Sequence, residues 1–292
     1  MQAPPLNPAF VLLQSASGAA LDCVAEPAVS DAAVHTARKA LKQARAALRL
    51  LRPALAERDY RSVNRCFRDA GRLLAPLRDA RALLATIARV TQHDASAARA
   101  LSTLAAALRV ELEQQRRGAA ELEQRRHCAA LIESARERVS RRPVAQADGE
   151  VLHRGLHKIY RSTRRAWRAA CNDHSPECLH EWRKQTKYLR TAAKILSDAG
   201  VRGLRKTVTR AERIADLLGE AHDLAVLEAA VRERVAREEQ GALLAHIERR
   251  RKKFEKRALA AAEKLLVEKA DDFGPPAQRY AKVSRVASSG AR

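Results

Sequence analysis

The chain has 292 residues, and its 56 lysines and arginines exceed its 34 aspartates and glutamates to leave a formal net charge of +22. Aromatic residues make up only 3% of the chain, and this scarcity, with the abundance of alanine, leucine, arginine, glutamate and glutamine, argues against sheets and favours an all-α fold. Such a charge predicts attraction to a polyanion: nucleic acid, an anionic membrane surface or a phosphate polymer. The five cysteines form an odd set without a C-x-x-C pair, which excludes a disulfide scaffold and fits free thiols in a reducing compartment.

Residues 1–28 contain four prolines, and we expect a flexible, poorly ordered N-terminal extension there. Its apolar stretch is interrupted at Gln14 and Ser15 and no basic segment precedes it, so we predict neither a signal peptide nor a membrane span. We therefore expect a cytoplasmic protein without a membrane partner.

A helix is predicted from about residue 30 to Arg52, where Pro53 follows. Five cationic side chains on it are separated by steps of 3, 4, 3 and 4 residues, which places them on one stripe of an α-helix. They are His35, Arg38, Lys42, Arg45 and Arg49. An apolar stripe runs one position earlier, from Val34 to Leu51, so the helix has an apolar edge beside a cationic one.

Three further helical stretches are expected in the first half, over residues 59–75, over 77–90, and as one long charged helix from about 94 to 142. Residues 143–149, which begin with proline and end with glycine, are the expected hinge between two halves.

The second half is predicted to contain a basic helix over 151–171, a helix ending at about Asp198, a helix over 201–218, a turn at Gly219 and two further helices to about Ala270. Residues 273–292 should form a loose tail. The helix ending at Asp198 repeats the cationic stripe, since every member of H-x-x-R-K-x-x-K-x-x-R returns at an offset of 145 from its first copy. Its members are His180, Arg183, Lys187, Arg190 and Lys194.

Because histidine and lysine are scarce in this chain, their return at identical spacing predicts an internal duplication. Further basic positions support a second cationic helix in each half, and a third stripe lies on the helix over 151–171. They are Arg65 and Arg68, their counterparts Arg210 and Arg213, and Arg161 and Arg165.

Like charges at i,i+3 and i,i+4 are each unfavourable by about 0.2 to 0.5 kcal/mol, so each stripe costs the free protein on the order of 1 to 2 kcal/mol. Few carboxylates lie on the stripes. We therefore favour a bound polyanion that neutralises the cations over the alternative, an arginine-rich surface that is merely solvated.

These residues resemble the CHAD domain family, through the two H-x-x-R-K-x-x-K-x-x-R copies and through Leu217–Asp223, which is similar to the family's L-L-G-x-x-x-D turn. The first half departs from that turn, with Pro76 and no glycine. The resemblance covers residues 29–272, as half one (29–142), hinge (143–149) and half two (150–272). It implies two four-helix bundles related by a pseudo-twofold axis, a shared basic channel, and binding of inorganic polyphosphate, in some members on polyphosphate granules.

We therefore interpret the sixteen cations named above as a polyphosphate-binding set, and we expect no catalytic residues, no cofactor and no metal. A zinc site at Cys171, His174, Cys178 and His180 is disfavoured because His35, the counterpart of His180, has no cysteine neighbours. A phosphohydrolase would need a carboxylate cluster, and the stripes offer cations instead. The alternative is a nucleic-acid-binding helical protein, because the same cations could bind the phosphate backbone of DNA or RNA. Aromatic residues for base stacking are few, however.

Overall fold

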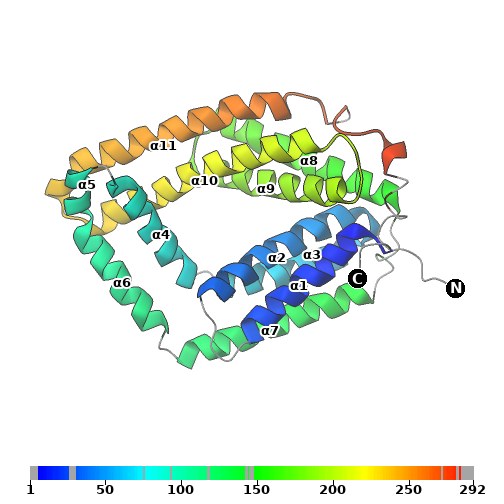
Figure 1. Ribbon diagram of the computed structural model, residues 1–292, viewed down its shortest axis with the longest axis horizontal. Helices are drawn as coiled ribbons and strands as arrows, with labels where there is room; N and C mark the ends of the chain where they lie inside the picture. The colour runs from blue at the N-terminus through cyan, green and yellow to red at the C-terminus, as the bar shows by residue number, and fades with distance from the viewer. Residues whose placement is uncertain are drawn as a thin grey trace.

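The computed structural model describes residues 6–25, 31–74, 76–92, 94–116, 119–141, 144, 148–270, 272–280 and 283 (Figure 1). Over these residues the chain forms eleven α-helices and no strand. The expectation of an all-α fold is confirmed. The expected hinge at 143–149 and the end of the tail fall mostly outside the described residues.

Four helices pack together as a first bundle. They are α1 (Pro8–Ala25), α2 (Asp31–Leu51), α3 (Glu57–Leu73) and α7 (Ala119–Ser140). Residues Val34, Ala37, Leu41, Ala44, Leu48 and Leu51 of α2 are all buried, as its apolar stripe predicts. A short 3-10 turn, Arg52–Ala54, ends α2 at Pro53, whose ring cannot continue the helix.

The expectation of a poorly ordered N-terminal extension is wrong for residues 8–25. They form α1, which buries Ala9, Leu13 and Ala20 completely against α2 and α7. Arg136 of α7 ties the helix in place, since its Nη1 donates to the Gln14 carbonyl at 2.7 Å. By length and composition α1 could also cross a membrane; in this fold one face of it lies in the bundle core, whereas Val11 is exposed. The prolines around it misled the sequence interpretation, because Pro8 stands at the helix start, where proline is tolerated.

The second bundle contains α8 (Gly149–Asn172), α9 (Pro176–Asp198), α10 (Arg205–Arg234) and α11 (Arg237–Leu266). Trp182, Leu189 and Leu196 of α9 are fully buried, so the second helix also keeps its apolar edge. The expected loose tail is wrong for its described part, because residues 273–280 return to α8. There the rings of Tyr160 and Phe273 stack with centroids 3.6 Å apart.

Two expected helix boundaries are corrected by the structure. The turn at Gly219 and two helices beyond it are absent: α10 continues through Gly219, and only α11 follows among the described helices. In the first half the helix does break, because Pro76 lacks the N–H that would continue α3, and α4 (Pro76–Thr91) starts there in a new direction (Figure 1).

The single long helix expected over 94–142 is three helices, α5 (Ala95–Ala100), α6 (Ser102–Arg116) and α7. Leu101, at the junction of α5 and α6, is fully buried in a second core. The helices α4, α5 and α6 share this core with the C-terminal part of α10 and the N-terminal part of α11. The interruption at Leu101 is slight, because its N–H donates to the Ala97 carbonyl at 3.0 Å and its carbonyl accepts from the Ala105 N–H at 2.9 Å.

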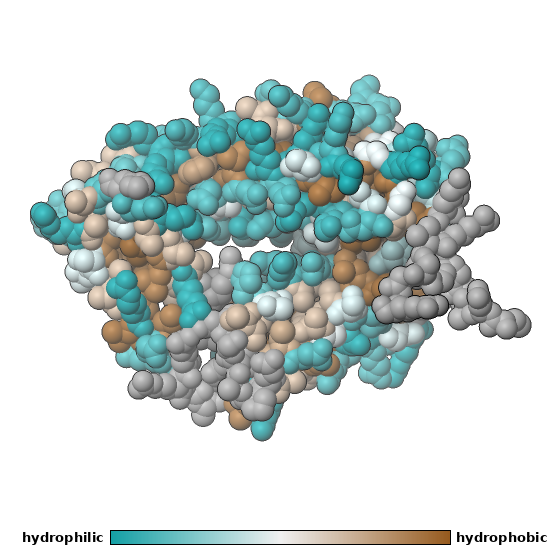
Figure 2. Space-filling model, viewed as in Figure 1, coloured by the Kyte–Doolittle hydropathy of each residue, from teal (hydrophilic) through white to brown (hydrophobic). Residues whose placement is uncertain are grey.

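The two bundles touch where α2 crosses α8. Gly155 of α8 lies so close to α2 that a Cβ there would stand 2.1 Å from the Leu50 carbonyl oxygen. The bundles also meet where α2 contacts α9. Elsewhere Figure 2 shows an opening between α2 on one side and α9 and α10 on the other, edged mostly by hydrophilic residues. We refer to it as the central opening.

Candidate functional site

The cationic stripe of α2 follows the line where α2 meets α3. Arg38 donates from Nη1 to the Gly71 carbonyl at 3.0 Å, and Arg45 donates from Nε to Asn64 Oδ1 at 3.2 Å. Both partners belong to α3, so the arginines are held in defined positions, and each residue is partly exposed. The exposed members of this stripe are His35 and Lys42.

The cationic stripe of α9 follows the line where α9 meets α10. Arg190 pairs with Glu212 of α10 through Nη2 and Oε1 at 2.6 Å. Arg183 lies over Gly219, where a Cβ would stand 3.4 Å from its Nη2. The glycine that we expected to form a turn instead lies inside α10, where the Arg183 guanidinium packs against it.

The cationic stripe of α2 reaches the second bundle at Tyr188, a buried residue of α9. The Arg49 guanidinium lies over its ring, 4.0 Å from the centroid, and that of Arg45 lies 5.7 Å away. Arg49 also donates to the Tyr60 hydroxyl of α3. Burial, more than any neighbouring charge, lowers the pKa of Arg45 from its usual value, yet a guanidinium remains protonated at neutral pH. These cation–π contacts join the first bundle to the second and fix the spacing between the stripes at this end.

The histidine of α9 has a neighbour that the histidine of α2 lacks by sequence. The rings of His180 and His222 of α10 lie with centroids 4.9 Å apart and tilted by 49°. Burial, and then the positive charge of Arg183, lowers the pKa of both imidazoles, that of His222 to about 4. Both copies of the motif histidine are exposed, but they are not equivalent, since His35 has Arg78 at the sequence position that corresponds to His222.

The other six predicted cations differ in what they contact. Arg68 lies near Arg45, whose pKa it helps to lower, and pairs with Asp69 at 2.9 Å. Arg210 instead points to α11, where its Nη1 donates to the Lys264 carbonyl at 2.6 Å, so we do not count it with the α9 stripe. The remaining four, which are exposed on their helices, are Arg65, Arg161, Arg165 and Arg213.

Carboxylates reach the stripes from positions that the helical pattern did not include. Besides Glu212 and Asp69, Asp198 pairs with Lys194 at 3.0 Å. All three pairs are substantially exposed to solvent, and exposed pairs contribute only about 0 to 1 kcal/mol each. Such weak pairs leave the stripes able to exchange these carboxylates for a ligand's phosphates.

Three residues of the site escaped the sequence interpretation. Tyr188 carried a signal in its rarity, as one of only four tyrosines in the chain. His222 was visible as a His-Asp pair, but its absence from the first half argued against a role. Gly219 was predicted to form a turn, and its contact with Arg183 is visible only in the structure.

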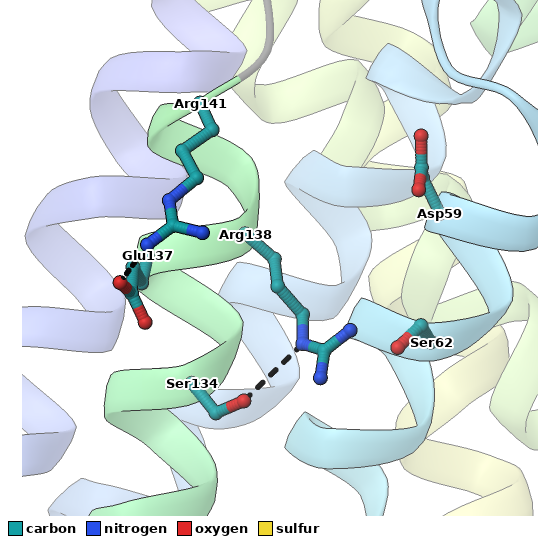
Figure 3. A pocket seen from close by; sticks show the side chains of 6 residues that line it. All are labelled: Asp59, Ser62, Ser134, Glu137, Arg138 and Arg141. Atoms are coloured by element: carbon teal, nitrogen blue, oxygen red, sulfur yellow. Dashed lines mark hydrogen bonds and ion pairs between the residues drawn. The ribbon is translucent and has the colours of Figure 1, made fainter.

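A pocket of about 270 Å³ lies apart from the stripes, between α3 and α7 (Figure 3). Arg138 donates to Ser134 there at 3.2 Å, and Arg141 pairs with Glu137. The negative charges of Asp59 and Glu137 balance the positive charges of the two arginines, so the pocket is a poor match for an anion.

Metal ligands do not gather in the described part of the chain, where no three histidine, cysteine, aspartate or glutamate side chains come together. Cys178 of the Cys171–His180 segment instead donates from Sγ to Asp173 Oδ2 at 3.3 Å.

One protein family matches the chain over most of its length: the CHAD domain, over residues 16–232. The match begins within α1 and ends within α10, so it includes both cationic helices. Among curated proteins, none matches the chain significantly.

Proposed function

Because the chain belongs to the CHAD domain family, we propose that it is a non-catalytic protein that binds inorganic polyphosphate along the cationic residues of α2 and α9. We call these two sets the α2 ladder (His35, Arg38, Lys42, Arg45 and Arg49) and the α9 ladder (His180, Arg183, Lys187, Arg190 and Lys194). The observation that carries the proposal is that two ladders of equal spacing belong to the helices on either side of the central opening, and that Arg45 and Arg49 of the α2 ladder contact α9 at Tyr188.

The chemistry of the ladders suits a flexible chain of phosphates. Arginine donates two parallel hydrogen bonds to phosphate oxygens, whereas lysine supplies a mobile point charge, so a mixed ladder holds the chain without requiring one register. A ladder spanning 14 residues of helix rises about 21 Å, which accommodates several successive phosphates. The ladder arginines that neighbouring helices hold in place lose little further freedom when they bind.

We place the bound chain in the central opening, which would act as a basic channel. On this proposal the equal ladders arose by internal duplication, and each half contributes one wall. A duplex is much wider than a single phosphate chain, which favours polyphosphate over double-stranded nucleic acid. Cytoplasmic location and association with polyphosphate granules follow as further parts of the same proposal.

A competition experiment tests the choice of ligand. Long-chain polyphosphate, duplex DNA and single-stranded RNA, matched in total charge, should compete for the protein with polyphosphate the tightest ligand. Equal affinities, or a preference for DNA, would contradict binding within the central opening and support the nucleic-acid alternative.

Charge-neutralising variants test where the ligand lies. Replacing Lys42 and Arg45 with glutamine in one protein, and Lys187 and Arg190 in another, should weaken polyphosphate binding in both by at least tenfold, since each change removes two phosphate contacts. A matched control removes the same charge from Lys253 and Lys256, on the exposed surface of α11.

The control separates specific from diffuse binding. If all three variants lose the same affinity, the protein attracts polyanions through its net charge alone and the ladders are not the site. If only one ladder variant loses affinity, the two ladders do not share a ligand.

A further inference from the structure

The pair formed by His180 and His222 lies among more cations than anions. On α9 the charged groups near it are Arg183, Lys184, Lys187 and Glu181, and on α10 they are Asp223 and Glu220. From α4, Arg89 reaches both α10 carboxylates.

The carboxylates around the pair are engaged elsewhere. Arg89 Nη2 lies 3.3 Å from Asp223 Oδ2, and Arg89 Nε lies 3.5 Å from Glu220 Oε2. Glu181 pairs with Lys184 and accepts from Gln185 Nε2 at 2.6 Å. The pair therefore lies in a positive environment, and His180 is exposed enough for a ligand to reach it.

An imidazole in such surroundings is neutral in the free protein. Burial and the charges of Arg183 and Lys187 both oppose protonation of His222, which accounts for its low pKa. A phosphate that binds to the same cations reverses the sign of the local field. Protonation of the neighbouring imidazoles then becomes favourable, because each imidazolium gains an anionic partner.

Building on the proposed function, we propose that His180 and His222 form a proton-coupled phosphate subsite, in which binding of a polyphosphate unit draws a proton from solvent onto an imidazole nitrogen. The subsite would lie at the end of the α9 ladder that is remote from Tyr188. It makes polyphosphate bind more tightly as the pH falls, and it belongs to the second half only.

The size of the effect follows from linkage. The pKa of His222 in the free protein is about 4, and a bound phosphate that restores the ordinary value of 6.5 raises the affinity about 25-fold between pH 7.5 and pH 5.0. The sign is fixed, because a group whose pKa rises on binding favours the complex at low pH. Arginine and lysine keep their charge over this interval, and so do the internal phosphates of a long chain, so neither contributes a comparable slope.

The test measures the dissociation constant of long-chain polyphosphate at pH 7.5, 6.5, 5.8 and 5.0, at fixed ionic strength. The proteins compared are wild type, His222→Asn and, as a matched control, His127→Asn, which removes an exposed histidine of α7. Asparagine retains hydrogen bonding but does not titrate in this range. The wild type and His127→Asn should show the full rise in affinity, and His222→Asn should lose most of it.

A direct measurement keeps the inference testable if His222→Asn does not fold. NMR titration of the wild-type imidazoles, with and without saturating polyphosphate, should show the pKa of His222 moving upward on binding by one unit or more. An unchanged pKa, or a His222→Asn variant whose affinity rises with falling pH as much as the control's, overturns the subsite and leaves the proposed function intact. Absence of polyphosphate binding at every pH overturns both.

Discussion

Gly219 provides the sharpest test of how the α9 ladder is built, because its effect depends on the size of the residue placed there. A Cβ at this position would lie 3.4 Å from Arg183 Nη2 and 3.6 Å from Nε, which is ordinary van der Waals contact. Gly219→Ala therefore fits, and alanine in the middle of α10 gains about 0.8 to 1.0 kcal/mol of helix propensity. The variant should be slightly more stable than wild type, by about 2 to 4 °C in Tm, with polyphosphate binding retained.

Gly219→Leu should separate binding from folding. Its larger side chain enters the space of the Arg183 guanidinium and displaces it. Loss of one charge-assisted hydrogen bond to phosphate costs about 1.5 to 3 kcal/mol, or roughly 10-fold to 150-fold in affinity. Overpacking in the buried backbone costs a further 1 to 3 kcal/mol, typically, in the stability of the free protein.

The assay is a double-mutant cycle on binding, with thermal melts of each free protein. Arg183→Gln should lower affinity as much as Gly219→Leu, and the double variant should be no worse than either, because both changes remove one contact. The reasoning is refuted if Gly219→Ala loses binding, if Gly219→Leu binds like wild type, or if the two losses add.

Three other outcomes are expected. Gly155→Ala places a Cβ against the Leu50 carbonyl of α2 and should lower the free energy of unfolding by about 3 kcal/mol in chemical denaturation. Gly241→Ala, with open space around it, should not destabilise the protein. Equal effects of the two variants would contradict the close crossing of α2 and α8. If the ladders neutralise six to ten phosphates, polyphosphate affinity should fall by roughly 10³ to 10⁵ between 50 and 200 mM salt, and a flat dependence would show the cations to be structural. In a thiol-labelling time course at pH 8, exposed Cys171 should react long before buried Cys128, whose pKa burial raises to about 11; comparable rates would contradict the packing of α7.

The helices that carry the site were well predicted, because helix formation depends on contacts three and four residues apart. The apolar edge of α2 is buried residue for residue as its periodicity indicates, and α2 ends beside Pro53 as expected. Helix boundaries failed where a local signal was ambiguous. Glycine interrupts a helix only when tertiary packing does not compensate for its low helix propensity. Around Gly219 the packing of α10 against α9 and α11 outweighs this loss in propensity.

The sequence by itself determined which residues are cationic, how they are spaced along two helices, and which edge of each helix enters a core. The tertiary structure decided what those cations touch. Arg45 and Arg49 lie against Tyr188, His180 lies against His222, and Arg210 turns away to α11. The periodicity within a helix does not contain these contacts, because each joins residues of two different helices. Their approach depends on crossings such as that at Gly155, where the absence of a single side chain brings the two bundles together.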